Sequence, residues 1–301
     1  MRPSFRSVPS PVLVLGGILS VQLGAGVAKG QLFDVLSPSA VVFYRLATSA
    51  VVLLLFGRLI VGRVLRGAGR GDMAVIVAFG VVLATMNLAF YESISRIPLG
   101  IAVTIEFLGP LGVAVALSRR RLDLMWVALA GLGVALLAGG GSGDLDPVGV
   151  GLALVAAACW AAYILLSAQT GRRFPGASGL ALASVVGTVV VAPIGLSSGG
   201  SQMWQLDLLT LGIVVGLLSS AIPYTLELEA LRRLPARTFG ILMSLEPAVA
   251  AMVGLVVLGE SLQLREVAAI GCVVAACLGT TRTRRQQSVT PSPGQEQTPT
   301  D

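Results

Sequence analysis

The sequence predicts an all-α integral membrane protein with ten transmembrane helices, arranged as two inverted five-helix repeats. Three observations lead to this prediction: an apolar composition, basic residues gathered in alternate connections, and an internal repeat. Of the 301 residues, 55% are hydrophobic and only 12% are charged. Because a bilayer offers the backbone no hydrogen-bond partners, apolar stretches of about 20 residues must cross it as helices.

Apolar stretches of membrane-spanning length predict where each helix begins and ends. We expect helices at residues 12–29, 39–57, 73–93, 99–118, 122–139, 148–168, 177–197, 208–230, 237–258 and 263–280. The connections between these stretches are short, so no soluble catalytic domain fits between them. The predicted repeats are residues 12–139 and residues 140–281.

Arginine gathers in every second connection, and this alternation predicts the orientation of the helices. One set of connections, together with the two ends, holds Arg2, Arg6, Arg58, Arg63, Arg66, Arg70, Arg119, Arg120, Arg121, Arg172, Arg173, Arg232, Arg233, Arg237, Arg282, Arg284 and Arg285. Positive charge is retained on the cytoplasmic side during insertion. We therefore expect both ends in the cytoplasm of a bacterial inner-membrane protein, with residues 1–11 leading the first helix and residues 282–301 as a disordered, Gln/Pro/Ser/Thr-rich tail.

The two halves of the chain repeat the same residues at one fixed separation. Glu92, Pro98, Leu108, Pro110 and Ala114 fall on Glu229, Pro235, Leu245, Pro247 and Ala251 without a gap. Five helices is an odd number, so the two halves enter the membrane in opposite senses. Inverted repeats of this kind are common in secondary transporters, which bind substrate near the bilayer midplane where the halves meet.

Glu106 is the first candidate for that site, because charge at mid-helix costs a few kcal/mol or more. It lies near the middle of the fourth predicted helix, and Pro110 cannot donate to its carbonyl. A carboxylate beside a freed carbonyl can bind an ammonium group or a proton. A carboxylate paired with an arginine, or kept protonated, is the structural alternative.

Two further charges lie within predicted helices. Glu246 precedes Pro247 near the middle of the ninth helix, where it either serves substrate or holds the repeat interface together. Arg45 lies in the second helix at a depth close to that of Glu106. We expect Arg45 either to pair with Glu106 or to receive a substrate carboxylate, which its planar guanidinium matches.

Charges near helix ends leave two interpretations open. Lys29 ends the first helix and either reaches the headgroups or lines the outer mouth with Gln22. Glu227, near the cytoplasmic end of the eighth helix, either lines the inner vestibule or serves no transport role.

Neutral polar and aromatic residues complete the candidate pathway: Asn87, Tyr91, Trp160, Tyr163 and Ser244. Asn87 and Tyr91 are four residues apart and share a helix face. Trp160 is too deep for an interfacial aromatic belt, which favours a place in a cavity wall over the usual belt. Asn87 and Ser244 are suited to bond a substrate hydroxyl.

Several functional classes lack their signatures here. The sequence has no histidine, and its three cysteines fit no metal motif. A nucleotide-binding GxxxxGKS or GxxxxGKT loop is absent. We therefore expect no enzyme, no cofactor and no nucleic-acid partner, and topology explains the net charge of +6. A membrane assembly protein is the alternative outside transport.

Several segments resemble the EamA family of the drug/metabolite transporter superfamily, and within it amino-acid exporters. They are Asn87–Val115, Ser118–Val127, Ala158–Leu165, Ser219–Glu227, Leu231–Ala251 and Leu258–Leu262. The resemblance implies alternating-access export of small amino acids such as threonine or homoserine, with Glu106, Glu227 and Glu246 at motif positions. Proton exchange through Glu106 is a hypothesis, and another small metabolite or a cationic drug is the alternative substrate.

Overall fold

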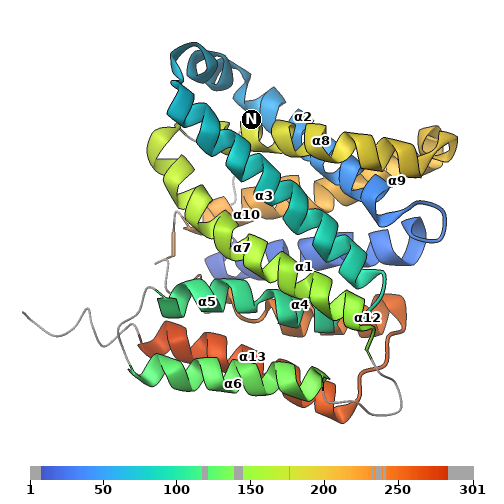
Figure 1. Ribbon diagram of the computed structural model, residues 1–301, viewed down its shortest axis with the longest axis vertical. Coiled ribbons are helices and arrows are strands. Elements are labelled where there is room, and N and C mark those ends of the chain that lie inside the picture. The colour runs from blue at the N-terminus through green and yellow to red at the C-terminus, as the bar shows by residue number, and fades with distance from the viewer. Residues whose placement is uncertain are drawn as a thin grey trace, which may run out of the picture.

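The computed structural model describes residues 8–116, 121–138, 145–175, 177–231, 233–234, 239 and 242–283, and every regular element in these ranges is helical (Figure 1). The all-α prediction is confirmed for this part of the chain. The remainder of the predicted leading segment and tail, residues 1–7 and 284–301, lies outside the described residues.

Five described helices are long and apolar enough to cross a bilayer: Ser10–Leu32, Pro38–Leu55, Arg70–Ile94, Pro147–Arg173 and Ser178–Gly199. Shorter apolar helices cover Leu99–Val113, Leu206–Ala221 and Glu246–Leu258. The molecule therefore has the helical content and apolarity of a membrane protein.

The first half of the chain begins with α1, which continues into a π-helix. Its elements are α1 (Ser10–Val27), η2 (Ala28–Leu32), α2 (Pro38–Gly67), α3 (Arg70–Ile94), α4 (Leu99–Glu106), α5 (Leu108–Ala116) and α6 (Arg121–Ala138). Helix α2 starts where its sequence favours a start: the Ser37 hydroxyl accepts from the backbone N–H of Ala40 at 3.3 Å, and Pro38 occupies the first turn.

The second half begins with two long helices and continues with shorter ones. Its elements are α7 (Pro147–Arg173), α8 (Ser178–Gly199), η3 (Ser201–Trp204), α9 (Leu206–Gly216), η4 (Leu217–Ala221), α10 (Ile222–Leu231), α12 (Glu246–Leu258) and α13 (Leu264–Thr283). Helix α12 ends at Gly259, whose φ of 67° lies in the left-handed region that glycine adopts readily.

The predicted helix 237–258 is interrupted by a turn at Ser244 and Leu245, before α12 begins at Glu246. Two other predicted spans are interrupted beside a proline. The predicted helix 99–118 breaks at Phe107, between α4 and α5, because Pro110 has no N–H for the carbonyl of Glu106. The predicted helix 208–230 contains the π-helix η4 just before Pro223, which has no N–H for the carbonyl of Ser219. Such local irregularities in helices often occur at functional sites.

Helices from the two halves pack directly against each other. Helix α2 packs on α8, α3 on α7 and α8, α1 on α10 and α12, and α9 on α2. Helices α6 and α13 lie side by side along one edge of the molecule (Figure 1). The approach of α4 to α12 requires a glycine, because a Cβ on Gly100 would lie 2.6 Å from the Cα of Ala251.

Candidate functional site

A cavity of about 310 Å³ lies among these helices, at the low end of the range for small-molecule sites. Its charged lining residues are Arg45, Glu106, Glu227 and Glu246. Its polar and aromatic lining residues include Gln22, Ser49, Asn87, Phe90, Trp160, Tyr163, Ser184, Ser219 and Ser220. A cavity that holds charges of both signs is suited to a small polar solute.

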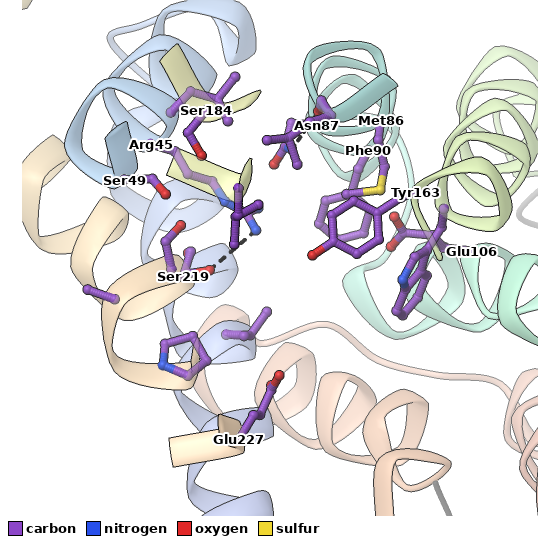
Figure 2. Close-up of a pocket in the computed structure, with 18 of the residues that line it drawn as sticks. Arg45, Ser49, Met86, Asn87, Phe90, Glu106, Tyr163, Ser184, Ser219 and Glu227 are labelled. Atoms are coloured by element: carbon purple, nitrogen blue, oxygen red, sulfur yellow. Dashed lines mark hydrogen bonds between the residues drawn. The ribbon is translucent and has the colours of Figure 1, made fainter. Parts of the chain in front are cut away.

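Arg45 extends from α2 into one wall of the cavity (Figure 2). Its Nη2 donates to the carbonyl of Ser219 at 3.4 Å, and its Cζ lies 5.4 Å from the centre of the Tyr91 ring. Within the described residues no ion pair joins Arg45 to Glu106, and a substrate carboxylate at Arg45 stays a prediction. The guanidinium has five N–H donors, and its contact with the Ser219 carbonyl engages only one nitrogen.

The backbone geometry of η4 explains why Arg45 finds a carbonyl there. Pro223 leaves the Ser219 carbonyl without its usual helical donor, and Arg45 fills that role. The neighbouring carbonyl of Leu218 accepts from the hydroxyl of Ser20 at 2.7 Å. The π-helix therefore offers backbone oxygens to side chains of α1 and α2.

Glu106 is the last residue of α4 and lies on the opposite side of the cavity from Arg45 (Figure 2). Glu106 is 8% exposed. Among the described residues, its carboxylate has no hydrogen bond or ion pair. Trp160 lies nearby, with its ring held edge-on by Phe107 at 4.9 Å between centroids. Glu106 is thus a buried acid without a protein counter-ion.

Glu246 is the first residue of α12, where the positive end of the helix dipole favours a carboxylate. Nε2 of Gln22 donates to its Oε1 at 3.0 Å. The other oxygens of the pair, Oε2 of Glu246 and Oε1 of Gln22, are buried without a hydrogen-bond partner. Sequence reasoning missed this contact, because the two residues are far apart in the chain and Gln22 carries no charge.

The other predicted site residues divide between the cavity and its surroundings. Asn87 lines the cavity and donates to the carbonyl of Leu83 at 2.7 Å, while Tyr163 packs on Phe79. Glu227 lines the cavity below Ser219 (Figure 2).

Tyr91 and Ser244 are buried but do not line the cavity. Tyr91 lies behind the Arg45 guanidinium. Lys29 does not line the cavity either. The structure therefore brings seven of the ten predicted side chains together: Arg45, Asn87, Glu106, Trp160, Tyr163, Glu227 and Glu246.

Lys29 belongs to a separate polar cluster that joins the two halves of the chain. Its Nζ lies 2.5 Å from Oε1 of Glu260 and donates to the carbonyl of Ile97 at 2.8 Å. Oε2 of Glu260 accepts from the backbone N–H of Leu99 at 2.9 Å. We name these four residues the Lys29 clamp. These contacts favour a role for Lys29 in joining the two halves over the interpretation that it reaches the headgroups alone.

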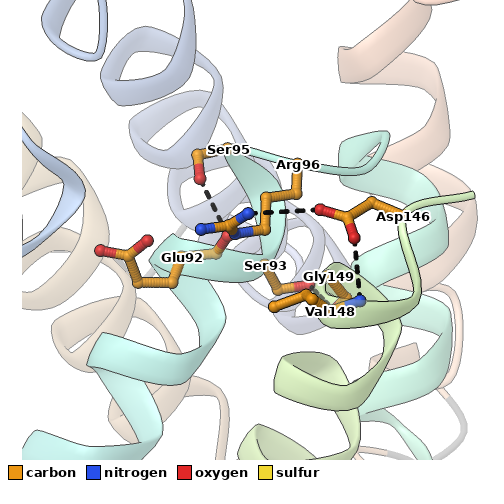
Figure 3. Close-up of polar contacts among 7 residues, drawn as sticks. All are labelled: Glu92, Ser93, Ser95, Arg96, Asp146, Val148 and Gly149. Atoms are coloured by element: carbon orange, nitrogen blue, oxygen red, sulfur yellow. Dashed lines mark hydrogen bonds and ion pairs between the residues drawn. The ribbon is translucent and has the colours of Figure 1, made fainter.

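A second polar contact joins α3 to the start of α7 (Figure 3). Arg96 pairs with Asp146 at 3.3 Å, and the Ser93 hydroxyl donates to the carbonyl of Gly149 at 2.8 Å. Asp146 also caps α7 by accepting from the N–H of Val148 at 2.9 Å. That hydrogen bond, followed by the one from Arg96, holds the pKa of Asp146 below its usual value.

Comparison with known proteins identifies the family. The EamA-like transporter family matches residues 147–282. The threonine/homoserine exporter RhtA of Escherichia coli (strain K12) is 42% identical over 293 residues, which cover 96% of this chain and 97% of RhtA. The chain belongs to the EamA-like transporter family. The RhtA of Salmonella typhimurium (strain LT2) is 41% identical, covering 95% of this chain and 97% of that protein.

Two further similarities are at lower sequence identity. The uncharacterized transporter YwfM of Bacillus subtilis (strain 168) is 28% identical over 48% of this chain and 50% of its own length. A solved crystal structure covers 92% of this chain and 98% of its own with a TM-score of 0.57 and 18% identity, which supports the fold alone. This EamA member is a multi-pass membrane protein.

Proposed function

We propose that this EamA transporter exports small amino acids of the threonine and homoserine type across the bacterial inner membrane. The observation that carries the proposal is the 42% identity to a threonine/homoserine exporter over 96% of the chain. The cavity agrees with it in size and chemistry. A small amino acid has one ammonium and one carboxylate, and the lining offers Arg45 together with Glu106, Glu227 and Glu246.

The topology that we propose is ten crossings in two inverted repeats, with both ends in the cytoplasm. The helix contacts support this topology. When each helix is replaced by its equivalent in the other half, the contacts named below are found again. The α3–α7 contact then corresponds to α10–α1, and α3–α8 corresponds to α9–α2. The contacts α2–α8, α4–α12 and α6–α13 each join equivalent helices, as a two-fold relation between the halves requires.

Alternating access follows from the positions of the cavity and the Lys29 clamp in that topology. The clamp then lies at the periplasmic end, where it ties η2 and the α3–α4 turn to the loop after α12. The cavity extends toward Glu227 and Met243, on the cytoplasmic side. We propose that rocking of the halves opens the clamp and exposes the cavity to the periplasm.

Proton exchange at Glu106 is the coupling step that we propose. Its buried carboxylate has no protein counter-ion among the described residues, so a proton or an ammonium group would neutralise it. Efflux that does not respond to an imposed pH gradient would contradict proton coupling and indicate that the protein is a facilitator.

The test is efflux of labelled threonine and homoserine from cells that express the protein. We expect faster efflux than from control cells, and its loss in Glu106→Gln at matched membrane level. Glu92→Gln is the matched control, because Glu92 lies outside the cavity lining and points away from the polar contacts around it (Figure 3). An absence of efflux from well-expressed wild-type protein would contradict amino-acid export.

A small cationic metabolite or drug is the second candidate substrate. The excess of three carboxylates over one arginine in the cavity favours a cation. Rescue of cells from toxic organic cations, together with no effect on threonine, would establish this alternative.

A further inference from the structure

We infer that the cavity contains two separate subsites for a zwitterionic amino acid, one for each charge. Gln22 and Glu246 bind the ammonium group, and Arg45 and Ser219 bind the carboxylate. The assignment rests on the proposed function and adds to it the residues that recognise each end of the substrate. It also makes Gln22 a determinant of specificity.

The ammonium subsite follows from two hydrogen-bond acceptors that lack donors. Gln22 and Glu246 are 2% and 7% exposed, and each has a buried side-chain oxygen without a partner. Buried polar atoms are nearly always satisfied, so two unsatisfied acceptors on a bonded pair require an explanation. An ammonium group brings three N–H donors and a positive charge, which satisfy both oxygens and neutralise Glu246.

Gln22 positions its partner as well as contacting the ligand. Its Nε2 already donates to Oε1 of Glu246 at 3.0 Å, which fixes the carboxylate and leaves Oε2 for the substrate. Among the acids that line the cavity, and within the described residues, Glu246 alone is hydrogen-bonded to a side chain that has an unpartnered acceptor of its own.

The carboxylate subsite follows from donors on α2 and η4. The Ser219 hydroxyl is buried without a partner, and Arg45 donates to the carbonyl of the same residue. A serine hydroxyl and a guanidinium are both donors to a carboxylate. Gly24 makes room for this hydroxyl, because a Cβ on Gly24 would lie 2.3 Å from Oγ of Ser219.

A cavity built in this way should reject ligands that lack either charge. Threoninol keeps the ammonium group and lacks the carboxylate, whereas N-acetylthreonine keeps the carboxylate and lacks the ammonium group. We expect each to compete at least about 10-fold more weakly than threonine, because either leaves a buried charged residue without its partner.

The test measures competition against labelled threonine in inverted vesicles containing the full-length protein. Glu246→Gln and Gln22→Met should weaken threonine and threoninol while leaving N-acetylthreonine nearly unchanged. Arg45→Gln and Ser219→Ala should weaken threonine and N-acetylthreonine while leaving threoninol nearly unchanged. Thr210→Ala is the control, because Thr210 is exposed and its hydroxyl bonds the carbonyl of Leu206 in its own helix.

Binding to the purified protein separates a loss of recognition from a loss of transport. It is followed by tryptophan fluorescence, to which Trp160 in the cavity wall contributes. Equal weakening of all three ligands in every variant would overturn the two subsites. An unchanged ratio of threonine to N-acetylthreonine in both Glu246→Gln and Gln22→Met would overturn the ammonium assignment. Wild-type protein that neither binds nor moves threonine would instead overturn the proposed function, and the subsites with it.

Discussion

The cavity and the Lys29 clamp use charged side chains in opposite ways. Both join the two halves of the chain, and both lie among apolar helices. In the clamp, Lys29 and Glu260 neutralise each other and also bond the backbone of Ile97 and Leu99. In the cavity, the described side chains of Arg45, Glu106, Glu227 and Glu246 form no ion pair. Of these four residues, Glu106 and Glu246 are buried. Charge inside a membrane protein is costly, so a cavity that leaves these side chains without an ion pair is prepared for a charged ligand.

The largest effect that follows from this comparison is at Arg45. We expect Arg45→Ala to lower threonine efflux about 100-fold, since removal of one buried charged partner costs roughly 3 kcal/mol. Arg45→Lys should recover part of the activity, because it restores the charge and not the planar fork. The measurement is efflux normalised to the amount of protein in the membrane.

Protein level distinguishes the two interpretations of Arg45. A binding role leaves the membrane level of Arg45→Ala close to that of wild type. If the level falls in proportion to efflux, Arg45 is structural, and the contrast between the cavity and the clamp no longer holds.

The Lys29 clamp should show the opposite behaviour, namely a defect that a second charge change repairs. We expect Lys29→Glu and Glu260→Lys each to lower efflux by about 10-fold. The double exchange should restore most of the lost efflux, because contacting residues couple by about 0.5–3 kcal/mol. Lys29→Met with Glu260→Met is the uncharged comparison. Additive effects in the charge exchange would show that the pair does not act as a unit.

The same comparison explains what could be predicted from the sequence. Hydropathy is a local property, so the approximate positions of the helices follow from the chain itself. The breaks near Pro110 and Pro223 were not predicted, although the missing N–H of each proline explains them once the structure is known. Charge inside a predicted helix is local too, and it identified Arg45, Glu106 and Glu246 before their positions were known.

What the sequence did not reveal depends on contacts between distant segments. Gln22 and Glu246, and likewise Lys29 and Glu260, meet only after the halves pack. Ser219 is one of many serines, and only its place in η4, beside Arg45, distinguishes it. The pairing of two distant residues leaves no local signal in the sequence, so these partners required the structure.

The smallest expected effect is at the contact of Arg96 with Asp146, a solvent-exposed counterpart of the Lys29 clamp. The carboxylate form of Asp146 is stabilised in the folded protein, first by the N–H of Val148, and its pKa is lowered from 3.8. A lowered pKa means that Asp146 stabilises the fold above its usual pKa and loses this contribution as the pH falls below about 4. We expect Asp146→Ala to lower the melting temperature slightly and by the same amount at pH 7 and pH 5, with the difference from wild type shrinking below pH 4. Asp146→Asn should recover most of the loss, because asparagine also caps helices. A difference that already shrinks between pH 7 and pH 5 would mean that another titrating group, and not this cap, holds α3 to α7.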